Sequence, residues 1–184
     1  MKIPFYDSTR EYLNYKADFD KAVSGVLESG AFILGTQVTE FENQISYYTG
    51  AKYAVGVANG SDALLIASDI LGYRNSPVLT PAFTFFASAS CIARLGGTPV
   101  FVDADEDTFC MDMHDAENRL TRDTKGIIPV HLFLQSADMG ACMKIAAQNN
   151  FTVIEDAAEA FGMKTIYDGA ERHAGTVGDF GVRV

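Results

Sequence analysis

Apolar residues recur along this 184-residue chain in two spacings, one typical of helices and the other of buried strands. Near the start, apolar positions three to four residues apart predict an amphipathic helix over 12–27. The same spacing over 38–48 predicts a second helix, with Thr36 available as its N-cap and Gly50 just past its end.

From residue 53 onward, short runs rich in Val and Ile alternate with longer helical patterns. The runs predict strands at 53–57, 78–80, 100–103, 126–130 and 151–155, and the intervening patterns predict helices at 62–71, 85–95, 112–120 and 137–148. Runs that are apolar on both faces are typical of strands buried in a parallel sheet between two layers of helices. We therefore predict an α/β fold with an open, mostly parallel sheet, in which residues 179–184 begin a further strand.

Length, composition and charge indicate a packed globular domain and argue against several kinds of binding partner. A chain of this length, 48% apolar and 21% charged, is expected to fold as one packed domain. The formal net charge of −10 argues against nucleic acid or an anionic membrane as a partner, since clustered Lys and Arg bind both. Because no signal peptide or apolar span of ~20 residues is visible, we expect a cytosolic protein. The spacing of Cys91, Cys110 and Cys142 indicates buried or incidental thiols rather than disulfides or a zinc site.

Ligands of open parallel sheets bind beyond the carboxyl ends of the strands, and the segment 59–62 follows the first predicted strand. Free backbone N–H groups at the start of the next helix would hold an anion such as a phosphate. Gly60 would allow close approach and Ser61 would add a hydroxyl donor. Alternatively, Ser61 merely caps the helix. Neither a GxGxxG nor a Walker motif occurs, so a Rossmann dehydrogenase or a P-loop NTPase is not favoured.

Phe85 follows the predicted strand 78–80, where an aromatic ring can lie flat on a planar heterocycle. The alternative is that Phe85 belongs to the apolar core.

Asp156 comes at the end of the apolar strand 151–155, where a buried carboxylate requires a partner. A protonated pyridine nitrogen would serve, and the pairing would keep the ring of pyridoxal 5'-phosphate (PLP) cationic, as its electron-sink chemistry requires. The alternatives are an ion pair with an arginine such as Arg94, or an acid favoured by the dipole at a helix start.

Taken together, several segments resemble one family. They are "NGSDAL", "PAFTFFASAS", "GGTPVFVDAD", "GIIPVHLF", "SADM", "VIEDAAEAFG" and "GTVGDFG", and they span nearly the whole chain in the family's order. The chain is thereby similar to the DegT/DnrJ/EryC1/StrS family of PLP-dependent sugar aminotransferases. The resemblance implies the large domain of a fold-type I PLP enzyme and a homodimer with active sites at the subunit interface. It also implies transfer of an amino group from glutamate to a nucleotide-linked keto sugar, in the biosynthesis of cell-surface polysaccharides or natural products.

The resemblance also assigns roles to residues. Gly60, Ser61 and the backbone at Asp62 match the positions that hold the cofactor phosphate. Phe85 matches the aromatic stacked on the pyridine ring, and Asp156 matches the acid paired with the ring nitrogen. Glu159 matches a position close to the ring hydroxyl. The loop 31–35 matches a segment that reaches the neighbouring subunit's site. We expect His131 to be a hydrogen-bonded structural residue rather than a catalytic base.

The chain departs from the family pattern after "GDFG". There the family continues through a serine to the lysine that forms the Schiff base with PLP, and then to a small C-terminal domain, whereas here only 182–184 follow. None of the seven lysines lies at the matching position, and Lys164 is expected to face solvent. We therefore expect residues 1–184 to be an incomplete PLP-binding large domain, without the small domain and without complete turnover by itself.

Two other functions remain open. The chain could be a non-catalytic partner of a full-length aminotransferase, to which it lends the interface loop. It could also perform lysine-free PLP or pyridoxamine phosphate (PMP) chemistry, as in the family's sugar dehydratases, where histidine replaces the lysine. This last function has little support from the sequence, because His173 precedes "GDFG" in a predicted surface turn.

Overall fold

Five short strands form the central sheet of the computed structural model, which describes residues 4 and 6–184. They are β1 (Pro77–Pro81), β2 (Thr98–Val102), β3 (Gly126–Ile127), β4 (Thr152–Asp156) and β7 (Phe180–Val182). Their order across the sheet is β2-β1-β3-β4-β7, and all four neighbouring pairs are parallel. The predicted α/β class is confirmed, and so is the strand predicted to begin within 179–184.

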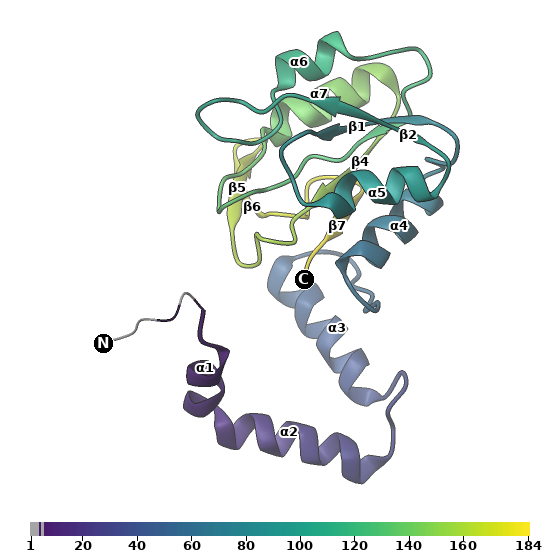
Figure 1. The fold of residues 1–184 in the computed structure, drawn as a ribbon. Helices are drawn as coiled ribbons and strands as arrows, with labels where there is room; N and C mark the ends of the chain where they lie inside the picture. The colour runs from purple at the N-terminus through teal and green to yellow at the C-terminus, as the bar shows by residue number, and fades with distance from the viewer. Residues whose placement is uncertain (1–3, 5) are drawn as a thin grey trace.

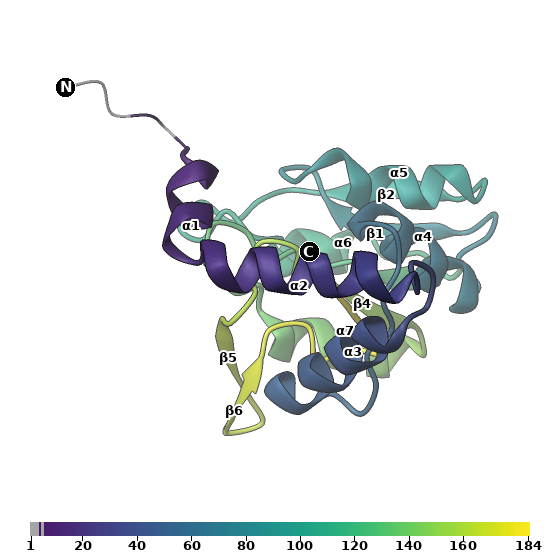
Figure 2. The same cartoon turned by 90° about the horizontal axis from the view of Figure 1, so that it is seen from below.

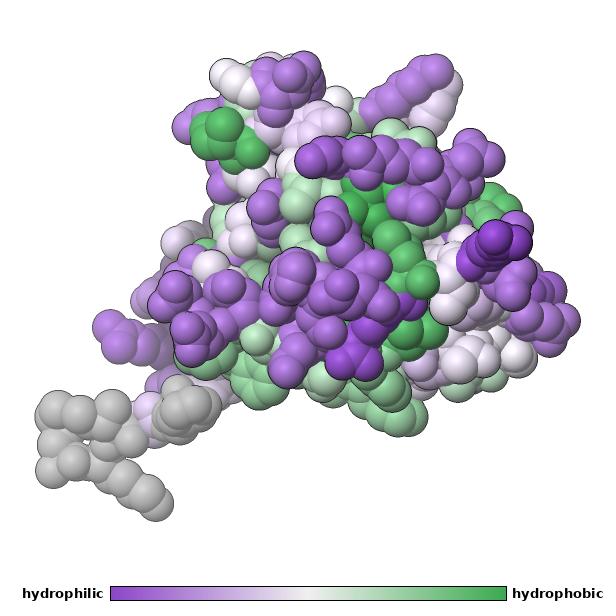
Figure 3. All heavy atoms as spheres, turned by 90° about the horizontal axis from the view of Figure 1, so that it is seen from above, coloured by the Kyte–Doolittle hydropathy of each residue, from purple (hydrophilic) through white to green (hydrophobic). Residues whose placement is uncertain are grey.

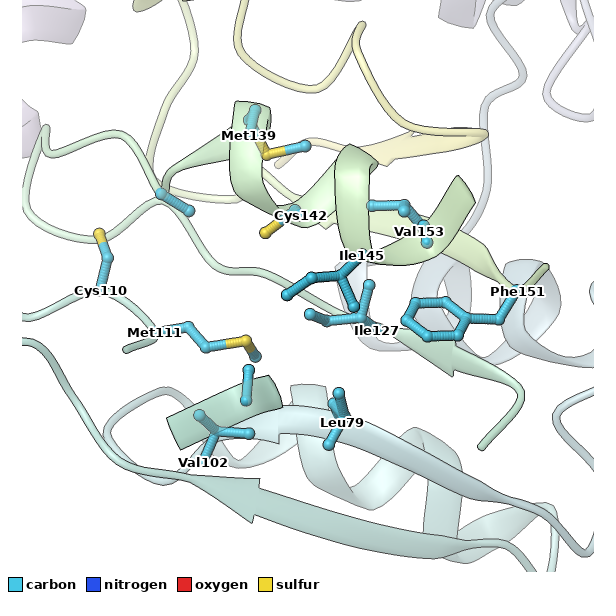
Figure 4. Close-up of a cluster of buried hydrophobic side chains, with 13 residues drawn as sticks. Leu79, Val102, Cys110, Met111, Ile127, Met139, Cys142, Ile145, Phe151 and Val153 are labelled. Carbon is cyan, nitrogen blue, oxygen red and sulfur yellow. The ribbon is translucent and has the colours of Figure 1, made fainter. Parts of the chain in front are cut away.

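One face of this sheet is covered by α6 (Met113–Asn118) and α7 (Met139–Asn149), which lie together above it in Figure 1. Leu79, Ile127 and Val153 point to this face and pack with apolar residues of both helices (Figure 4). The outer surface on this side is largely hydrophilic, with a narrow hydrophobic strip (Figure 3). An amphipathic helix with its apolar side on the sheet gives this pattern.

The opposite face is covered by α4 (Gly60–Ile70) and α5 (Phe86–Arg94). Val78 and Ile154 pack with these helices, although each is the chain neighbour of a residue in the first cluster. Successive strand residues point to opposite faces, so a strand between two helix layers must be apolar on both. This alternation explains why continuous Val and Ile runs predicted β1 and β4.

The N-terminal helices are placed differently. α1 (Ser8–Asn14) and α2 (Lys16–Ser29) contain no buried residue and lie apart from the sheet in Figure 1, while Figure 2 shows α2 running beneath the body. The single helix predicted over 12–27 is therefore two helices, because the backbone leaves the helical conformation at Tyr15. α3 (Thr36–Thr49) matches the second prediction, with Gly50 as its left-handed C-cap, but Gly35 rather than Thr36 occupies the N-cap position.

The strand predicted at 53–57 is wrong. This segment pairs with no strand in the described part of the chain, and Tyr53 and Val55 are 76% and 77% exposed. Strand propensity reflects packing against neighbouring strands rather than a strong backbone preference, so an apolar run without a neighbour does not form a ladder. Here β4 is the strand paired with β7, and 53–57 does not reach the sheet.

A hairpin that the apolar pattern did not predict lies beside the sheet. β5 (Lys164–Tyr167) and β6 (Ala170–His173) pair antiparallel through Asp168 and Gly169, both with positive φ. Asp-Gly is a typical two-residue hairpin turn, so a local signal was present. His173, predicted in a surface turn, instead ends β6 and packs against the Tyr48 ring with 4.9 Å between ring centroids.

The three cysteines are buried and unpaired, as predicted. Among the residues that the structure describes, every helix is too short or too polar to cross a membrane.

Candidate functional site

A cavity of about 250 Å³ opens at the carboxyl ends of the strands, where the sequence placed the site. Its wall includes five of the six predicted cofactor-binding residues, namely Gly60, Ser61, Phe85, Asp156 and Glu159. The sixth, Asp62, lies in the first turn of α4 beside Ser61 but does not border the cavity. Residues up to 99 positions apart in the sequence therefore meet at one place.

A second hollow of about 520 Å³ lies between the β5–β6 hairpin and the start of α7. It is wider and more open, and none of the predicted site residues borders it. Its carboxylates, Asp138 and Asp168, are exposed, and Asp138 already accepts the Ala141 N–H as the N-cap of α7. The smaller cavity, which contains a buried carboxylate, is therefore the candidate site.

The N-terminus of α4 forms one side of the cavity. Asn59 is its N-cap and accepts the Asp62 N–H at 2.9 Å, so the alternative in which Ser61 caps the helix is wrong. The Asn59 amide also donates to the Asp62 carboxylate at 3.0 Å. Because the Asp62 N–H already has this partner, it can bind a phosphate only by sharing or exchanging it. The N–H groups of Gly60 and Ser61 remain the donors that a helix start leaves free.

Gly60 lies close to the exposed Val184 side chain at this helix start. A Cβ added there would lie 2.5 Å from Val184 Cγ2, so a larger residue would force this part of the wall to shift. Gly60 borders the cavity, and the close approach of a phosphate to it stays a prediction.

Phe85 stands at the N-cap position of α5 and forms another part of the wall. Its side chain is 74% exposed, so the alternative that places it in the apolar core is wrong. A large exposed aromatic ring beside a cavity is available to cover a planar ligand.

Asp156 also lines the cavity and is only 4% exposed. Its Oδ2 accepts a hydrogen bond from Ser88 Oγ at 2.8 Å, and its Oδ1 accepts one from the Ala158 N–H at 3.3 Å. Burial raises the pKa of this carboxyl above its ordinary value, and the Ser88 hydrogen bond only partly offsets that effect. Within residues 4 and 6–184, Asp156 has no ion pair; Arg94 instead lies 3.9 Å from Asp62, so the predicted Arg94 alternative is wrong.

Glu159 brings a second carboxylate to the cavity, where its Oε2 accepts the Phe133 N–H at 3.4 Å. No Lys or Arg in the described part of the chain borders the cavity. The described lysines are all exposed, and Lys164, predicted to face solvent, pairs with Glu171 at 2.9 Å. The cavity wall therefore combines two acids with the backbone N–H donors of a helix N-terminus, which suits a ligand that carries both a cationic and an anionic group.

Glu155, the neighbour of Asp156, belongs to a network that the sequence did not reveal. Its side chain is fully buried and accepts hydrogen bonds from His131 Nε2 at 3.0 Å and from the N–H groups of Gly175, Val177 and Gly178. His131 Nδ1 accepts the Ala137 N–H at 3.1 Å, so its remaining proton lies on Nε2 and points to Glu155. The predicted hydrogen bonding of His131 is confirmed; because His131 also lines the cavity, its structural rather than catalytic role stays a prediction.

Comparison with known proteins identifies the family. The sequence model of the DegT/DnrJ/EryC1/StrS aminotransferase family matches residues 14–183. The chain is 42% identical over 179 residues to dTDP-3-amino-3,6-dideoxy-alpha-D-galactopyranose transaminase of Aneurinibacillus thermoaerophilus, covering 96% of this chain and 48% of that protein.

Two solved structures show the same fold. DesV of S. venezuelae, in complex with a ketimine intermediate, superposes with a TM-score of 0.89 at 35% identity, covering 95% of this chain and 46% of that one. NtdA of Bacillus subtilis, with bound cofactor PMP, gives a TM-score of 0.81 at 33% identity, covering 85% of this chain and 37% of that one. The chain spans about half the length of the curated relatives it matches.

Proposed function

This chain belongs to the DegT/DnrJ/EryC1/StrS aminotransferase family, and on that premise we propose that it forms the PLP-binding part of an enzyme that aminates a nucleotide-linked keto sugar. PLP, when bound, supplies the electron sink for transfer of the amino group. Asp156 would pair with the ring nitrogen, Phe85 would cover the ring, and Glu159 would lie near the ring hydroxyl. Gly60, Ser61 and the first turn of α4 would hold the phosphate.

The observation that carries this proposal is the buried carboxylate of Asp156, which forms no ion pair with any residue that the structure describes. An ionised carboxylate with 4% exposure and two hydrogen bonds is costly unless a cation comes close to it. The cavity beside Asp156 can admit that cation. A protonated aromatic nitrogen suits both wall residues, because the carboxylate would pair with its charge and the exposed Phe85 ring could cover its ring. A phosphate at the other end of the same ligand would suit the N-terminus of α4.

Binding of PMP tests the proposal directly, because PMP has the ring and the phosphate but needs no Schiff base. We expect PMP to quench protein fluorescence or to give a calorimetric signal with the wild-type protein. Asp156→Ala should weaken binding by about 30-fold or more, as expected when one partner of a buried ion pair is removed. Equal affinity of the two proteins would contradict the proposal.

Asp69→Ala provides the matched control. Asp69 lies on the same helix as the proposed phosphate site, but its side chain is exposed and pairs with Arg74. The substitution removes the same charge without changing the cavity, so PMP affinity should stay at the wild-type level. A comparable loss in both variants would indicate a general effect of net charge.

We further propose that this polypeptide holds PLP without a covalent bond. The described lysines are exposed and none borders the cavity. Borohydride reduction of the protein mixed with PLP should therefore leave no stoichiometric adduct at a single lysine, as judged by peptide mass spectrometry. A site-specific adduct at full occupancy would show that a lysine reaches the ring.

The amino donor and the assembly are also proposals. We propose glutamate as donor, a cytoplasmic location, and a homodimer in which the loop 31–35 reaches the neighbouring copy. Phe32, Ile33 and Leu34 in this loop are highly exposed, and apolar surface of this kind favours association. Ile33→Asp should shift the protein towards monomer in analytical ultracentrifugation, and an unchanged distribution would argue against a contact through this loop.

A further inference from the structure

Two hydroxyl groups connect the cavity wall to the buried carboxylate of Asp156. Thr84 borders the cavity, and its Oγ1 lies 3.2 Å from Ser88 Oγ. Ser88, in the first turn of α5, is fully buried and reaches Asp156 Oδ2 at 2.8 Å. Both hydroxyls come from the segment after β1, whereas the carboxylate comes from the end of β4.

The chemistry of the groups fixes the direction of these hydrogen bonds. An ionised carboxylate has no proton to give, so Ser88 donates to Asp156. A serine hydroxyl has one proton, so the hydrogen bond between Ser88 and Thr84 must then use the proton of Thr84. Among the described residues, Ser88 is the side-chain donor to Asp156, and the other hydrogen bond, from the Ala158 N–H, is longer at 3.3 Å.

We propose that Ser88 is a positioning residue, oriented by Thr84, that holds the Asp156 carboxylate ionised and in the orientation that pairs with a cationic ring in the cavity. This inference rests on the proposed function. Hydrogen bonds to a charged group are stronger than those between neutral groups and favour the charged form. Without the Ser88 hydroxyl, Asp156 would keep only the backbone donor, would be protonated more readily and would be free to rotate.

The first measurement is PMP affinity of Ser88→Ala at neutral pH. We expect binding about 10- to 100-fold weaker than in the wild type, the effect of one hydrogen bond to a charged group. Ser90→Ala is the matched control: it makes the same change two residues along α5, where the Ser90 hydroxyl donates to the Ala87 carbonyl at 3.4 Å. The control should bind PMP like the wild type, and Ser88→Ala binding as tightly as the control would overturn the proposal.

A ligand without the ring nitrogen separates positioning from a general packing defect. In 1-deaza-PMP a carbon replaces that nitrogen, so the ligand cannot pair with Asp156. Ser88→Ala should change its affinity by no more than about twofold, because the hydrogen bond acts only through the ion pair. An equal loss for PMP and for the deaza analogue would show that Ser88 merely supports the shape of the cavity.

Ser88→Thr keeps the test decisive if the alanine variant fails to fold. Threonine retains the hydroxyl, so PMP affinity should stay within about threefold of wild type in a variant with a normal thermal melt. A well-folded Ser88→Thr that binds as weakly as Asp156→Ala would overturn the proposal.

The two proposals fail in different ways. If PMP does not bind the wild-type protein, the proposed function is wrong, and the role of Ser88 falls with it. If PMP binds and Asp156→Ala weakens its binding while Ser88→Ala does not, the proposed function stands and only the positioning role is wrong.

The pH at which bound PMP changes its absorbance gives an independent readout. In Ser88→Ala the ring nitrogen should lose its proton at a lower pH than in the wild type, because its partner carboxylate is less readily ionised.

Discussion

At the end of β4, two neighbouring carboxylates lie on opposite sides of the sheet and have very different hydrogen-bond partners. On the α7 side, Glu155 is surrounded by donors, namely His131 and three backbone N–H groups from the loop 175–178. On the α5 side, Asp156 has one side-chain donor, one backbone donor and a cavity. The residues are adjacent in sequence and both are buried, so burial alone does not separate a structural acid from a functional one.

The pKa values of the two acids reflect this difference. Burial by itself would raise the pKa of Glu155, but the hydrogen bonds from His131 and the backbone outweigh it and hold the pKa below its ordinary value. For Asp156, burial dominates and the pKa is raised. A buried acid such as Glu155, whose hydrogen-bond partners all come from the fold, stabilises the fold. A buried acid such as Asp156, which has few partners and borders a cavity, is suited to bind a cationic ligand.

The largest expected effect is on the Glu155 side. Glu155→Ala leaves three backbone N–H groups and His131 without their acceptor, and should lower the free energy of unfolding by about 3–5 kcal/mol. Urea denaturation measures this loss. Glu171→Ala, which removes an exposed acid, serves as the control and should leave the midpoint unchanged. A loss below about 1 kcal/mol for Glu155→Ala would mean that the network contributes little to stability.

On the Asp156 side, we expect loss of ligand stabilisation rather than loss of the fold. Asp156→Asn retains an acceptor for Ser88 and removes a costly charge, so the ligand-free protein should unfold within about 1 kcal/mol of wild type. With PMP at 100 times its Kd, the wild type should gain about 2.7 kcal/mol, and the variant should gain much less at the same concentration. Thermal melts without and with PMP measure the stability of the ligand-free protein and the gain on binding. An equal gain in wild type and Asp156→Asn would show that Asp156 does not act on the ligand as proposed.

The pH dependence of stability should also differ between the two sides. Since the folded-state pKa of Glu155 lies below its ordinary value of 4.5, its stabilisation is complete above pH 4.5 and is lost as the pH falls through the folded-state value. Since the folded-state pKa of Asp156 lies above 3.8, its ionisation costs stability at neutral pH, and that cost disappears as the pH falls.

Stepped-pH urea denaturation of two variants tests these signs. The deficit of Glu155→Gln relative to wild type should shrink as the pH falls below 4.5. Any advantage of ligand-free Asp156→Asn over wild type should be greatest near neutral pH and should also shrink with acid. A Glu155→Gln deficit that grew with acid would show the assigned sign to be wrong.

The smallest expected effect concerns the cavity wall. Because the Phe85 ring is 74% exposed, Phe85→Ala should change the free energy of unfolding by no more than about 0.5 kcal/mol. Loss of ring stacking should still weaken PMP binding by about 3- to 10-fold. Phe86→Ala, the neighbouring aromatic with 78% exposure, does not border the cavity and should leave binding unchanged. Similar binding losses at both positions would argue against a specific role for Phe85.

The sequence by itself determined the parallel sheet and most of its helices. The runs that became β1 and β4 are apolar on both faces, and this pattern arises from burial between two helix layers. The order of these elements also placed the candidate site, because the residues after parallel strands meet at one edge. Five of the six predicted site residues line the cavity there, and their roles towards PLP stay predictions.

Only the tertiary structure decided which distant segments and side chains contact one another. Residues 53–57 have a strand-like sequence but meet no strand in the described chain, and the helices α1 and α2 have apolar positions but bury none of them. Ser88 lies 68 residues before Asp156, and the N–H groups that bind Glu155 come from a loop about 20 residues after it. Local periodicity reports which side of an element is apolar. It does not report which distant group lies opposite, because that depends on how the whole chain packs.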